Sequence, residues 1–372
     1  MTMRLTHLRL VQFRNHRHTD LTPAPGVTLF VGENAQGKSS LLEAVQVAAT
    51  GRSFRARHDA EMIALGEEWA RVRAAVERGD RVEEIDVALR REEGGALPRA
   101  GREMRVNGVP VRRGELFGHL RCVLAAPDDA EVVTGPPHRR RRMLDLLLAQ
   151  ISPAYYYAAQ RYVRVLTQRN RLLRVRGRGI EAWDEQVATL GAALTARRGD
   201  YVARLSTLAE AIYAELCRGR EVLRVAYLPS LRGEKETAMV TWAREALLRS
   251  RSEEAARGVT LVGPHRDDLL LLVDGRDLRA YGSRGQHLTA MLALRLAERR
   301  VLLEETGEEP VLLLDDVLLT LDEARQAYLL AGVRQAQALI TVTSAAVAGL
   351  PAGAAVYRVR AGQVEGERAH LS

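Results

Sequence analysis

The segment Gly32-Glu33-Asn34-Ala35-Gln36-Gly37-Lys38-Ser39 decides the fold of this chain. It matches the pattern G-x-x-x-x-G-K-[ST], in which backbone N–H groups of a glycine-rich turn and of the following helix converge on phosphate oxygens. The apolar run Val27–Val31 before it predicts a buried strand, and Ser39–Val45 after it predicts a helix. Strand, loop and helix therefore follow in the order that a phosphate-binding loop requires. The alternative is a glycine-rich turn that caps an ordinary helix.

Two side chains of this loop would act on a bound nucleotide. Lys38 would reach the β- and γ-phosphates as a positive point charge, and the hydroxyl of Ser39 would ligate Mg²⁺. The chain contains only two lysines, Lys38 and Lys235, so a lysine at this position is informative. We therefore predict ATP and Mg²⁺ as cofactors. The residues expected to contact the nucleotide from this loop are Gly32, Asn34, Gly37, Lys38, Ser39 and Ser40.

A second segment, Val311-Leu312-Leu313-Leu314-Asp315-Asp316, ends an apolar run in two acids. The run predicts a buried strand, and ligands gather at the carboxyl ends of strands in α/β sheets. Asp315 would hold the metal through water, and Asp316 would orient or deprotonate the attacking water. We predict Asp315, Asp316 and Lys38 as catalytic residues, and Ser39 and Asp315 as metal ligands. In isolation, the segment would equally suit a strand that leads into a polar turn.

The composition indicates a globular protein with a basic balance. Of its 372 residues, 47% are hydrophobic, and the formal net charge is +8. This balance suggests a polyanionic partner, although arginine-biased codons would also produce it. Cys122 and Cys217 lack the spacing of a disulfide framework or a zinc site, which favours a cytoplasmic location. The uncharged stretch 335–357 contains Thr, Ser, Gly and Pro, so it predicts a core strand with turns and no membrane partner.

The order of the patterns predicts a fold that is split by a helical insertion. Residues 4–124 alternate apolar and polar positions, as antiparallel strands do, and Asn107-Gly108 predicts a hairpin turn. Residues 136–217 instead carry leucines at helical spacing. Gly177-Arg178-Gly179 interrupts them and predicts the turn between two long antiparallel helices. Strand patterns return after about residue 257.

A loop before the acidic strand resembles a known motif. Gly282-Ser283-Arg284-Gly285-Gln286 is similar to the signature loop of the ABC ATPase superfamily, and it lies about 30 residues before the acidic strand. The resemblance implies that Ser283, Gly285 and Gln286 contact the ATP of a second chain, so that two nucleotides are sandwiched in a homodimer. On its own, the pattern would mark the capped start of an ordinary helix.

Within that superfamily, the sequence closely resembles the RecF family of recombination mediators, which is related to chromosome-maintenance ATPases. Two of the matching segments are specific, because transporters lack them: Gly51-Arg52-Ser53-Phe54-Arg55 and Gly263-Pro264-His265-Arg266-Asp267-Asp268. Without the family, each would be interpreted as a solvated turn. The other matching segments are Phe13-Arg14-Asn15, the loop 32–38, Ser283-Arg284-Gly285-Gln286 and Asp315-Asp316-Val317.

The resemblance implies an α/β fold. Its ABC-type P-loop ATPase head would combine a mixed sheet with an antiparallel β subdomain, and an α-helical arm with a short antiparallel coiled coil would interrupt it. We predict that residues 1–125, with the P-loop, and residues 257–372, with the signature loop and the acidic strand, form the head. The basic, mainly helical arm would comprise residues 126–256.

The resemblance also implies a function: a weak ATPase that uses hydrolysis as a conformational switch for DNA binding in recombinational repair and replication-gap processing. It implies binding of double-stranded and gapped DNA by an ATP-closed homodimer, and loading of a recombinase with RecO and RecR. Three positions depart from the expected patterns. Leu319-Thr320 precedes Asp322 in place of a serine and a glutamate, Thr343 replaces the histidine of transporters, and residues 126–129 contain no glutamine.

Residues 136–180 predict DNA contacts from the arm, because they contain eleven arginines and one acid. Arginine pairs bidentately with phosphates, and neutralising several phosphates gives sequence-independent, salt-sensitive binding. An arginine-rich solvated helix is the alternative. Tyrosines of this segment could stack on bases, but packing between helices is their commoner role; they are Tyr155, Tyr156, Tyr157 and Tyr162. The predicted DNA contacts are Arg139, Arg140, Arg141, Arg142, Arg171 and Arg174.

Two other functions fit parts of the pattern. A nucleotide-binding subunit of an ABC transporter would share both loops but have a much shorter segment between them, whereas Lys38 and Ser283 lie 245 positions apart. A structural chromosome-maintenance protein would need a far longer coiled coil than an arm of about 80 residues provides. The transporter subunit is the alternative function.

Overall fold

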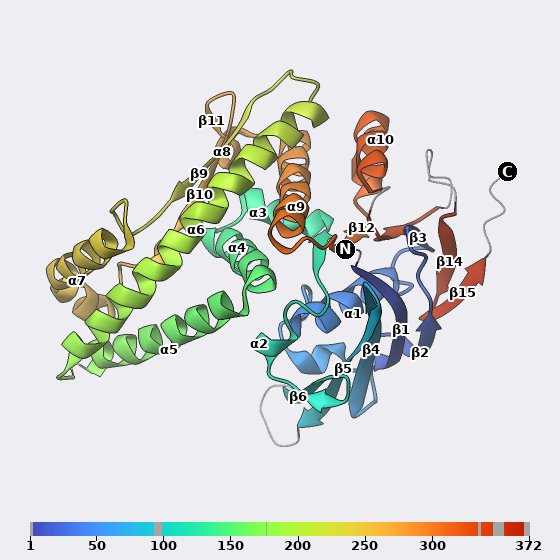
Figure 1. Ribbon diagram of the computed structural model, residues 1–372, viewed down its shortest axis with the longest axis horizontal. Helices are drawn as coiled ribbons and strands as arrows, with labels where there is room; N and C mark the ends of the chain where they lie inside the picture. The colour runs from blue at the N-terminus through green and yellow to red at the C-terminus, as the bar shows by residue number, and fades with distance from the viewer. Residues whose placement is uncertain (1–2, 93–98, 176, 334–335, 345–352, 368–372) are drawn as a thin grey trace. The chain divides into compact units, whose positions relative to one another are not determined.

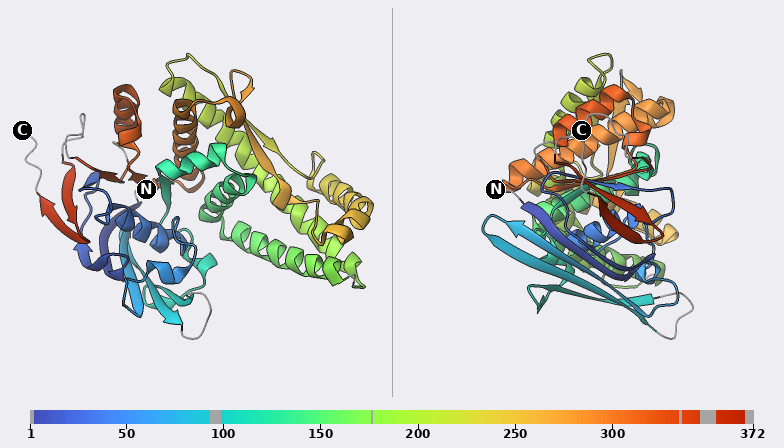
Figure 2. Two further views of the ribbon diagram at one scale, coloured as in Figure 1. Left: turned by 180° about the vertical axis from the view of Figure 1, so that it is seen from behind. Right: turned by 90° about the vertical axis from the view of Figure 1, so that its right-hand side faces the viewer.

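The computed structural model describes residues 3–92, 99–175, 177–333, 336–344 and 353–367. The chain divides into two compact units. Unit 1 comprises Met1–Asp129 and Glu298–Ser372, and unit 2 comprises Ala130–Ala297. Each unit has a hydrophobic core of its own. Figures 1 and 2 show the strands of unit 1 and the helices of unit 2 from three directions.

Unit 1 contains two six-stranded sheets and a few helices. Its elements are β1 (Met3–Phe13), β2 (His16–Leu21), β3 (Val27–Val31), α1 (Lys38–Thr50), η1 (Asp59–Met62), β4 (Trp69–Arg78), β5 (Arg81–Glu92), β6 (Arg99–Val106), β7 (Val109–Pro110), α2 (Arg113–Leu116), β8 (Cys122–Ala125), β12 (Val311–Asp315), η4 (Leu318–Thr320), α10 (Glu323–Gly332), β13 (Ala338–Val342), β14 (Ala355–Arg360) and β15 (Gln363–Glu367). A 3-10 turn, η2 (Pro127–Ala130), follows β8.

The sheet with the strand order β15-β14-β3-β13-β12-β8 carries both predicted motif strands. Its strands run parallel except β15, which pairs antiparallel with β14. β3 precedes the phosphate-binding loop and β12 ends in the two acids, so both strand predictions are confirmed. β13 lies between β3 and β12. The carboxyl ends of these three strands therefore meet at one edge of the sheet, where α/β folds bind ligands.

The other sheet, β2-β1-β4-β5-β6-β7, is antiparallel throughout and confirms the alternation seen in the sequence. In β4, every second residue from Ala70 to Val76 is buried. Asn107 and Gly108 both have positive φ angles, 51° and 78°, and join β6 to β7. This is the hairpin turn that an Asn-Gly pair predicts.

Helix α1 lies between the two sheets of unit 1 (Figure 1). Every residue of α1 except Ser39 is buried, including polar residues such as Glu43 and Gln46. Leu41 and Val45 belong to one core cluster with β1, β4 and β5 on one side, and with Leu313 and Leu339 on the other. The core therefore fixes the helix that begins at the phosphate-binding loop.

Unit 2 is mainly helical and includes a three-stranded sheet, β11-β10-β9. Its elements are α3 (Glu131–Thr134), α4 (Pro137–Ile151), α5 (Pro153–Val175), α6 (Ile180–Leu216), β9 (Leu223–Leu228), α7 (Glu236–Arg257), η3 (Pro264–Arg266), β10 (Asp268–Val273), β11 (Arg276–Asp277), α8 (Leu278–Tyr281) and α9 (Arg284–Thr306), whose last turns belong to unit 1. Within the described ranges, no helix combines the length and apolar character that crossing a bilayer requires.

The long helices α5 and α6 form the antiparallel pair predicted for the arm (Figures 1 and 2). Gly177 and Gly179 fall between the end of α5 and the start of α6, which confirms the predicted turn. Tyr155 and Tyr162 of α5 are buried in a cluster with Val187 of α6. These two tyrosines therefore pack between helices, and their rings are not accessible for stacking on bases.

The boundaries of the two compact units differ from the predicted domain boundaries. Residues 257–297, which the sequence groups with the head, belong to unit 2. The cause is strand pairing, because β10 pairs with β9 along its whole length, with Leu271 opposite Val225. The signature-like loop, Gly282–Gln286, therefore belongs to the same unit as the arm helices.

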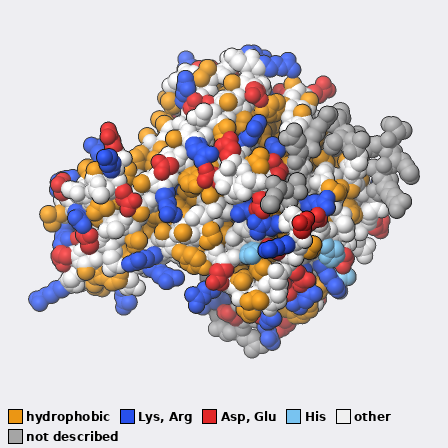
Figure 3. All heavy atoms as spheres, viewed as in Figure 1, with side chains coloured by type: hydrophobic (Ala, Val, Ile, Leu, Met, Phe, Trp, Pro, Cys, Tyr) orange, Lys and Arg blue, Asp and Glu red, His pale blue; other side chains and the backbone are white. Residues whose placement is uncertain are grey.

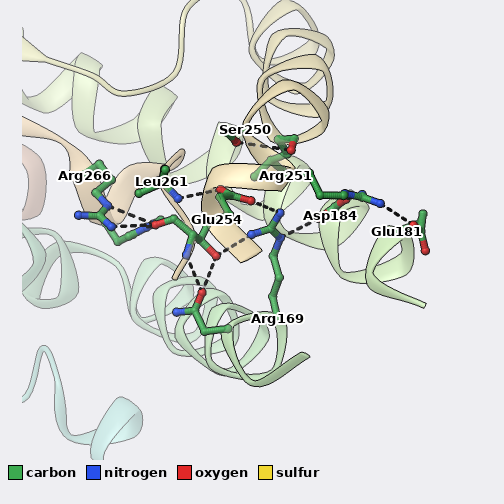
Figure 4. A network of polar contacts seen from close by, with 12 residues as sticks. Arg169, Glu181, Asp184, Ser250, Arg251, Glu254, Leu261 and Arg266 are labelled. Carbon is green, nitrogen blue, oxygen red and sulfur yellow. Dashed lines mark hydrogen bonds and ion pairs between the residues drawn. The ribbon is translucent and has the colours of Figure 1, made fainter. Parts of the chain in front are cut away.

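A buried ion-pair network joins α5, α6 and α7 (Figure 4). Arg169 of α5 is fully buried, and its guanidinium donates to Asp184 of α6 (2.7 Å) and to Glu254 of α7 (2.6 Å). It also donates to the hydroxyl of Thr260 (2.8 Å). The equally buried Glu254 accepts the backbone N–H of Leu261 (2.7 Å). Because buried charges are stable only with such partners, the network determines how the three helices pack.

Replacing Arg169 with Met should destabilise unit 2, because the buried carboxylate of Glu254 loses its charged partner. Removal of one member of a buried pair costs about 3–5 kcal/mol, and we expect the free energy of unfolding in urea to fall by this amount. Arg244→Met is the matched control, because the ion pair of Arg244 with Glu185 is exposed and should contribute little. Equal losses of stability in the two variants would contradict the role of the network.

Candidate nucleotide-binding site

The phosphate-binding loop connects the carboxyl end of β3 to the start of α1 in unit 1. Gly37 has a φ of 113°, a conformation that side chains rarely adopt. A Cβ atom at this position would lie 2.7 Å from Nδ2 of Asn15 and 2.8 Å from Nε2 of His16. Glycine at position 37 is therefore required by both the backbone and its neighbours.

Asn15 and His16, at the turn between β1 and β2, hold this loop. Nδ2 of Asn15 donates to the carbonyl of Gln36 (2.9 Å), and Nε2 of His16 donates to the carbonyl of Gly37 (3.0 Å). Nδ1 of His16 accepts from the hydroxyl of Thr19 (2.9 Å). Burial lowers the pKa of His16, so its ring is neutral, as these two contacts require. The loop backbone is thus fixed by the segment that begins with Phe13-Arg14-Asn15.

Lys38 lies folded onto the loop. Its side chain is buried, and the ammonium donates to the carbonyls of Gly32 (2.7 Å) and Glu33 (2.9 Å). An ammonium group carries three donors, so it can link the loop to a phosphate oxygen. Ser40 is buried, whereas Asn34 is exposed.

The structure brings Ser39, Asp315 and Thr341 together at the edge of the parallel sheet. The hydroxyl of Ser39, from α1, donates to Oδ1 of Asp315 at the end of β12 (2.8 Å). The hydroxyl of Thr341, from β13, donates to the same oxygen (2.8 Å). The role of Thr341 could not be predicted from the sequence. Its only signal is a polar residue near the carboxyl end of an apolar run, and nothing in the sequence places that run beside β12.

The two acids after β12 differ in burial and backbone. Burial raises the pKa of Asp315, while the hydrogen bonds from Thr341 and Ser39 and the positive charge of Arg55 favour its ionised form. Asp316 has a φ of 50°, an uncommon conformation for a non-glycine residue. Its backbone N–H donates to the hydroxyl of Thr341 (2.8 Å), which supports this conformation. Thr341 therefore positions both acids.

The donor set at this edge fits Mg²⁺. A serine hydroxyl and a carboxylate are hard oxygen ligands, and Mg²⁺ is usually held by one or two such protein groups, with water and phosphate oxygens as the others. Buried Asp315 also carries a charge that a cation would compensate. Among the residues that the structure describes, no cluster of three or more His, Cys, Asp or Glu side chains offers a competing metal site.

The segment Gly51–Arg55 is anchored to α1 by a buried carboxylate. Glu43 is fully buried and accepts two hydrogen bonds from the guanidinium of Arg14 (2.9 and 2.7 Å). It also accepts the hydroxyl proton of Ser53. Oγ of Ser53 in turn accepts the backbone N–H of Arg55 (2.9 Å). The segment is therefore fixed to the nucleotide-site helix and is not the solvated turn that its composition alone suggests.

The signature-like loop begins α9 in unit 2. The backbone N–H of Gln286 donates to Oγ of Ser283 (3.2 Å), and the backbone N–H of Ser283 donates to Oε1 of Gln286 (2.8 Å), which forms a capping box. Ser283, Arg284 and Gly285 are exposed. A Cβ atom at Gly285 would contact only Oγ of Ser283, at 3.9 Å. Unlike Gly37, Gly285 is therefore not required by the packing of its own chain.

Residues 4–364 match the family described as the RecF/RecN/SMC N terminal domain. The chain is 44% identical to the DNA replication and repair protein RecF of Symbiobacterium thermophilum, a match that covers 97% of this chain and 98% of the relative. The chain belongs to the RecF family. It is also 36% identical to the RecF protein of Alkaliphilus oremlandii, which covers 98% of this chain and all of the relative.

Solved structures of RecF proteins share the fold. A structure of the recombination mediator protein RecF with ATP, from the RecFOR pathway, superposes with a TM-score of 0.90 at 34% identity and covers 98% of this chain and 99% of that chain. The Smc head domain of Pyrococcus furiosus has a TM-score of 0.58 at 15% identity and shares the fold. The ABC-type ATPase head with a helical arm is thus confirmed, and the RecF family is favoured over the transporter alternative.

The second family-specific segment, Gly263–Asp268, has a structural role in unit 2. Asp267 is buried and accepts from the guanidinium of Arg198 on α6 (3.0 Å). Asp268 accepts from Nε of Arg140 on α4 (2.6 Å). The two aspartates therefore neutralise buried arginines of two different helices.

The structure removes Arg140 from the predicted DNA contacts. Its guanidinium is buried, and besides Asp268 it donates to backbone carbonyls, including that of Val132 (3.0 Å). Arg141 is partly buried and donates to the carbonyl of Asp267 (2.7 Å). Each residue of a helix is turned about 100° from the one before it, so the four consecutive arginines of α4 do not all lie on its exposed face. For Arg139, Arg142, Arg171 and Arg174, which are exposed, DNA contact stays a prediction.

Exposed arginines lie along one side of α5, where Figure 3 shows basic side chains at the edge of the helical unit. They are Arg161, Arg164, Arg171 and Arg174. Their spacing of three, seven and three positions keeps them on one face of the helix. In the part of the chain that the structure describes, none of the four forms an ion pair with an acid. This face is therefore positively charged and open to a polyanion.

His265 makes the stability of unit 2 depend on pH. Its Nε2 donates to the carbonyl of Thr260 (3.0 Å), and its Nδ1 accepts from the hydroxyl of Tyr162 (2.7 Å), so the ring is neutral. Burial lowers the pKa of His265 from 6.5 to about 4, and nearby arginines contribute. The unfolded chain therefore binds more protons between these values. The neutral ring of His265 makes its full contribution to the free energy of unfolding above pH 6.5, and this contribution is lost as the pH falls toward about 4.

Replacing His265 with Gln should reduce this pH dependence. Glutamine can donate to the same carbonyl without titrating. Wild type and variant are compared by their free energies of unfolding, measured in urea at each pH. We expect the difference between them to fall by about 1–2 kcal/mol from pH 7 to pH 5. A difference that stays constant across this range would contradict a neutral, buried His265.

Proposed function

We propose that this chain is an ATP-binding protein of recombinational DNA repair and replication-gap processing, and that it hydrolyses ATP slowly as a conformational switch. The observation that carries the proposal is the hydrogen bond between Ser39 and Asp315, two residues 276 positions apart. It joins a phosphate-binding loop to a carboxylate strand in the relation that Mg²⁺-ATP requires. The relatives named DNA replication and repair proteins support the repair role.

Different residues of the chain would bind the phosphates, hold the metal and orient the attacking water. When bound, Mg²⁺ would supply positive charge next to the phosphates, and Ser39 and Asp315 would hold it. Lys38 would exchange the carbonyls of its own loop for β- and γ-phosphate oxygens. Ser39 would ligate the metal directly and Asp315 through water, while Thr341 keeps the carboxylate of Asp315 oriented. Asp316, held in its unusual backbone conformation, would orient or deprotonate the attacking water.

A second copy of the chain would complete each site. The exposed Ser283 and the open surroundings of Gly285 leave room for a phosphate to approach the start of α9, where backbone N–H groups favour anions. Two chains would close on two ATP molecules, each held between the P-loop of one chain and the signature loop of the other. Hydrolysis would then release the dimer.

The exposed arginine face of α5 would contact the DNA backbone when the dimer closes. Such contacts are insensitive to sequence and weaken as salt rises, because they release counterions. We propose that the substrate is duplex DNA, including gapped DNA, and that the protein acts in the cytoplasm at the nucleoid. The RecFOR pathway of a solved relative suggests RecO and RecR as partners in loading a recombinase.

Light-scattering mass, measured with and without ATP and duplex DNA, tests the ATP-dependent dimer. We expect the wild-type mass to double only with ATP, and the dimer to retain DNA at moderate salt. Lys38→Met should abolish ATP binding and dimer formation, because it removes the charge that meets the phosphates. Ser283→Arg should bind ATP but stay monomeric, because it blocks only the signature loop. A Lys38→Met chain that still dimerises with ATP would refute the proposal.

A further inference from the structure

The segment after α6 contacts the signature-like loop. Helix α6 ends at Leu216, and Glu221 follows in a short turn before β9. Oε1 of Glu221 accepts a hydrogen bond from Nε2 of Gln286 (3.0 Å), although the two residues lie 65 positions apart. Oε2 of Glu221 accepts the hydroxyl proton of Tyr213 (2.7 Å). Each oxygen of this carboxylate therefore has a partner, one in α6 and one in the loop.

This contact fixes the orientation of the Gln286 amide. Its Oε1 accepts the backbone N–H of Ser283, so its NH₂ group must point the other way, toward Glu221. The backbone N–H of Gln286 holds the hydroxyl oxygen of Ser283. Glu221 therefore acts on Ser283 through one residue, Gln286, whose side chain accepts from the backbone N–H of Ser283 and whose backbone N–H donates to its hydroxyl.

Tyr213 supports Glu221 from inside the unit. Its ring is fully buried, and burial together with its hydrogen bond to Glu221 raises the pKa of its hydroxyl. The phenol therefore stays protonated and donates. The Sγ atom of Cys217 also lies 3.7 Å from Oε2 of Glu221. Glu221 is thus held on one side by the last turns of α6, while its other oxygen faces the loop.

We propose that Glu221 is a positioning residue for the signature loop. It holds Gln286 so that Ser283 and the first N–H groups of α9 present the geometry needed to bind the nucleotide of a second chain; this role rests on the ATP-closed dimer proposed above. Helix α6 has 37 residues, a length of about 55 Å, and begins at the turn that ends α5. Glu221 therefore ties the signature loop to the helix that spans the arm.

A charge exchange between the two positions tests this role. Gln286→Glu keeps an acceptor for the backbone N–H of Ser283, since glutamate suits a capping box, but it places two carboxylates against each other. Glu221→Gln places two amides against each other. The double variant Glu221→Gln/Gln286→Glu restores an amide that donates to a carboxylate, in the reverse direction. Glu185→Gln, on an exposed part of α6, is the matched control.

Two readouts separate positioning from simple loss of structure. Titration with a fluorescent ATP analogue, at concentrations where the chain is monomeric, measures nucleotide binding at the P-loop. All variants should bind the analogue with the affinity of the wild type. ATP-dependent dimer formation, measured by light scattering, tests whether the signature loop contacts the nucleotide of the second chain. We expect Gln286→Glu to weaken dimerisation about tenfold or more, Glu221→Gln to weaken it less, and the double variant to recover most of the loss. Glu185→Gln should dimerise normally.

The possible results are distinguishable. A wild-type chain that stays monomeric with ATP would overturn the proposed dimer, and with it any role of Glu221 toward a second chain. A wild-type chain that dimerises, together with single variants that dimerise equally well, would overturn the role of Glu221 alone. Folded single variants that fail to dimerise, with no recovery in the double variant, would also contradict it, because the effect would not come from this contact.

Discussion

Oδ1 of Asp315 accepts hydrogen bonds from the hydroxyls of Ser39 and Thr341, and the candidate site depends on this shared acceptor. The three residues come from α1, β12 and β13, which the parallel sheet and the core of unit 1 hold together. Burial alone would favour the protonated form of Asp315. The two hydroxyls and the charge of Arg55 counter part of this effect, but the pKa of Asp315 stays above its usual value.

Buried acids paired with arginines recur in both units and fix the segments that identify the family. Glu43 with Arg14 anchors the segment after α1 in unit 1, and Asp267 with Arg198 anchors a loop of unit 2. Such buried ion pairs add little net stability compared with apolar packing. They do disfavour other arrangements of the chain, because those would leave a buried charge without its partner. Part of the arginine content is therefore structural, and the number of arginines overstates the exposed basic surface.

The elements that local pattern specifies could be predicted from the sequence: the P-loop with its strand and helix, the Asn107-Gly108 hairpin and the turn between α5 and α6. Contacts between distant segments could not. Thr341 gains its role only because β13 lies beside β12, and Glu221 only because a turn after α6 meets the start of α9. Composition also misled at Arg140, because a run of four arginines on a helix necessarily turns one of them toward the core.

We propose that the P-loop of one chain and the signature loop of another form one nucleotide site. Mixing Lys38→Met chains with Ser283→Arg chains tests it most directly, because each chain alone lacks one half of every site. A mixed dimer contains one intact site, made of the P-loop of the Ser283→Arg chain and the signature loop of the Lys38→Met chain. We expect ATP hydrolysis to be absent in either variant alone and to return when the two are mixed. Hydrolysis by Ser283→Arg alone at the wild-type rate, or no recovery in the mixture, would contradict it.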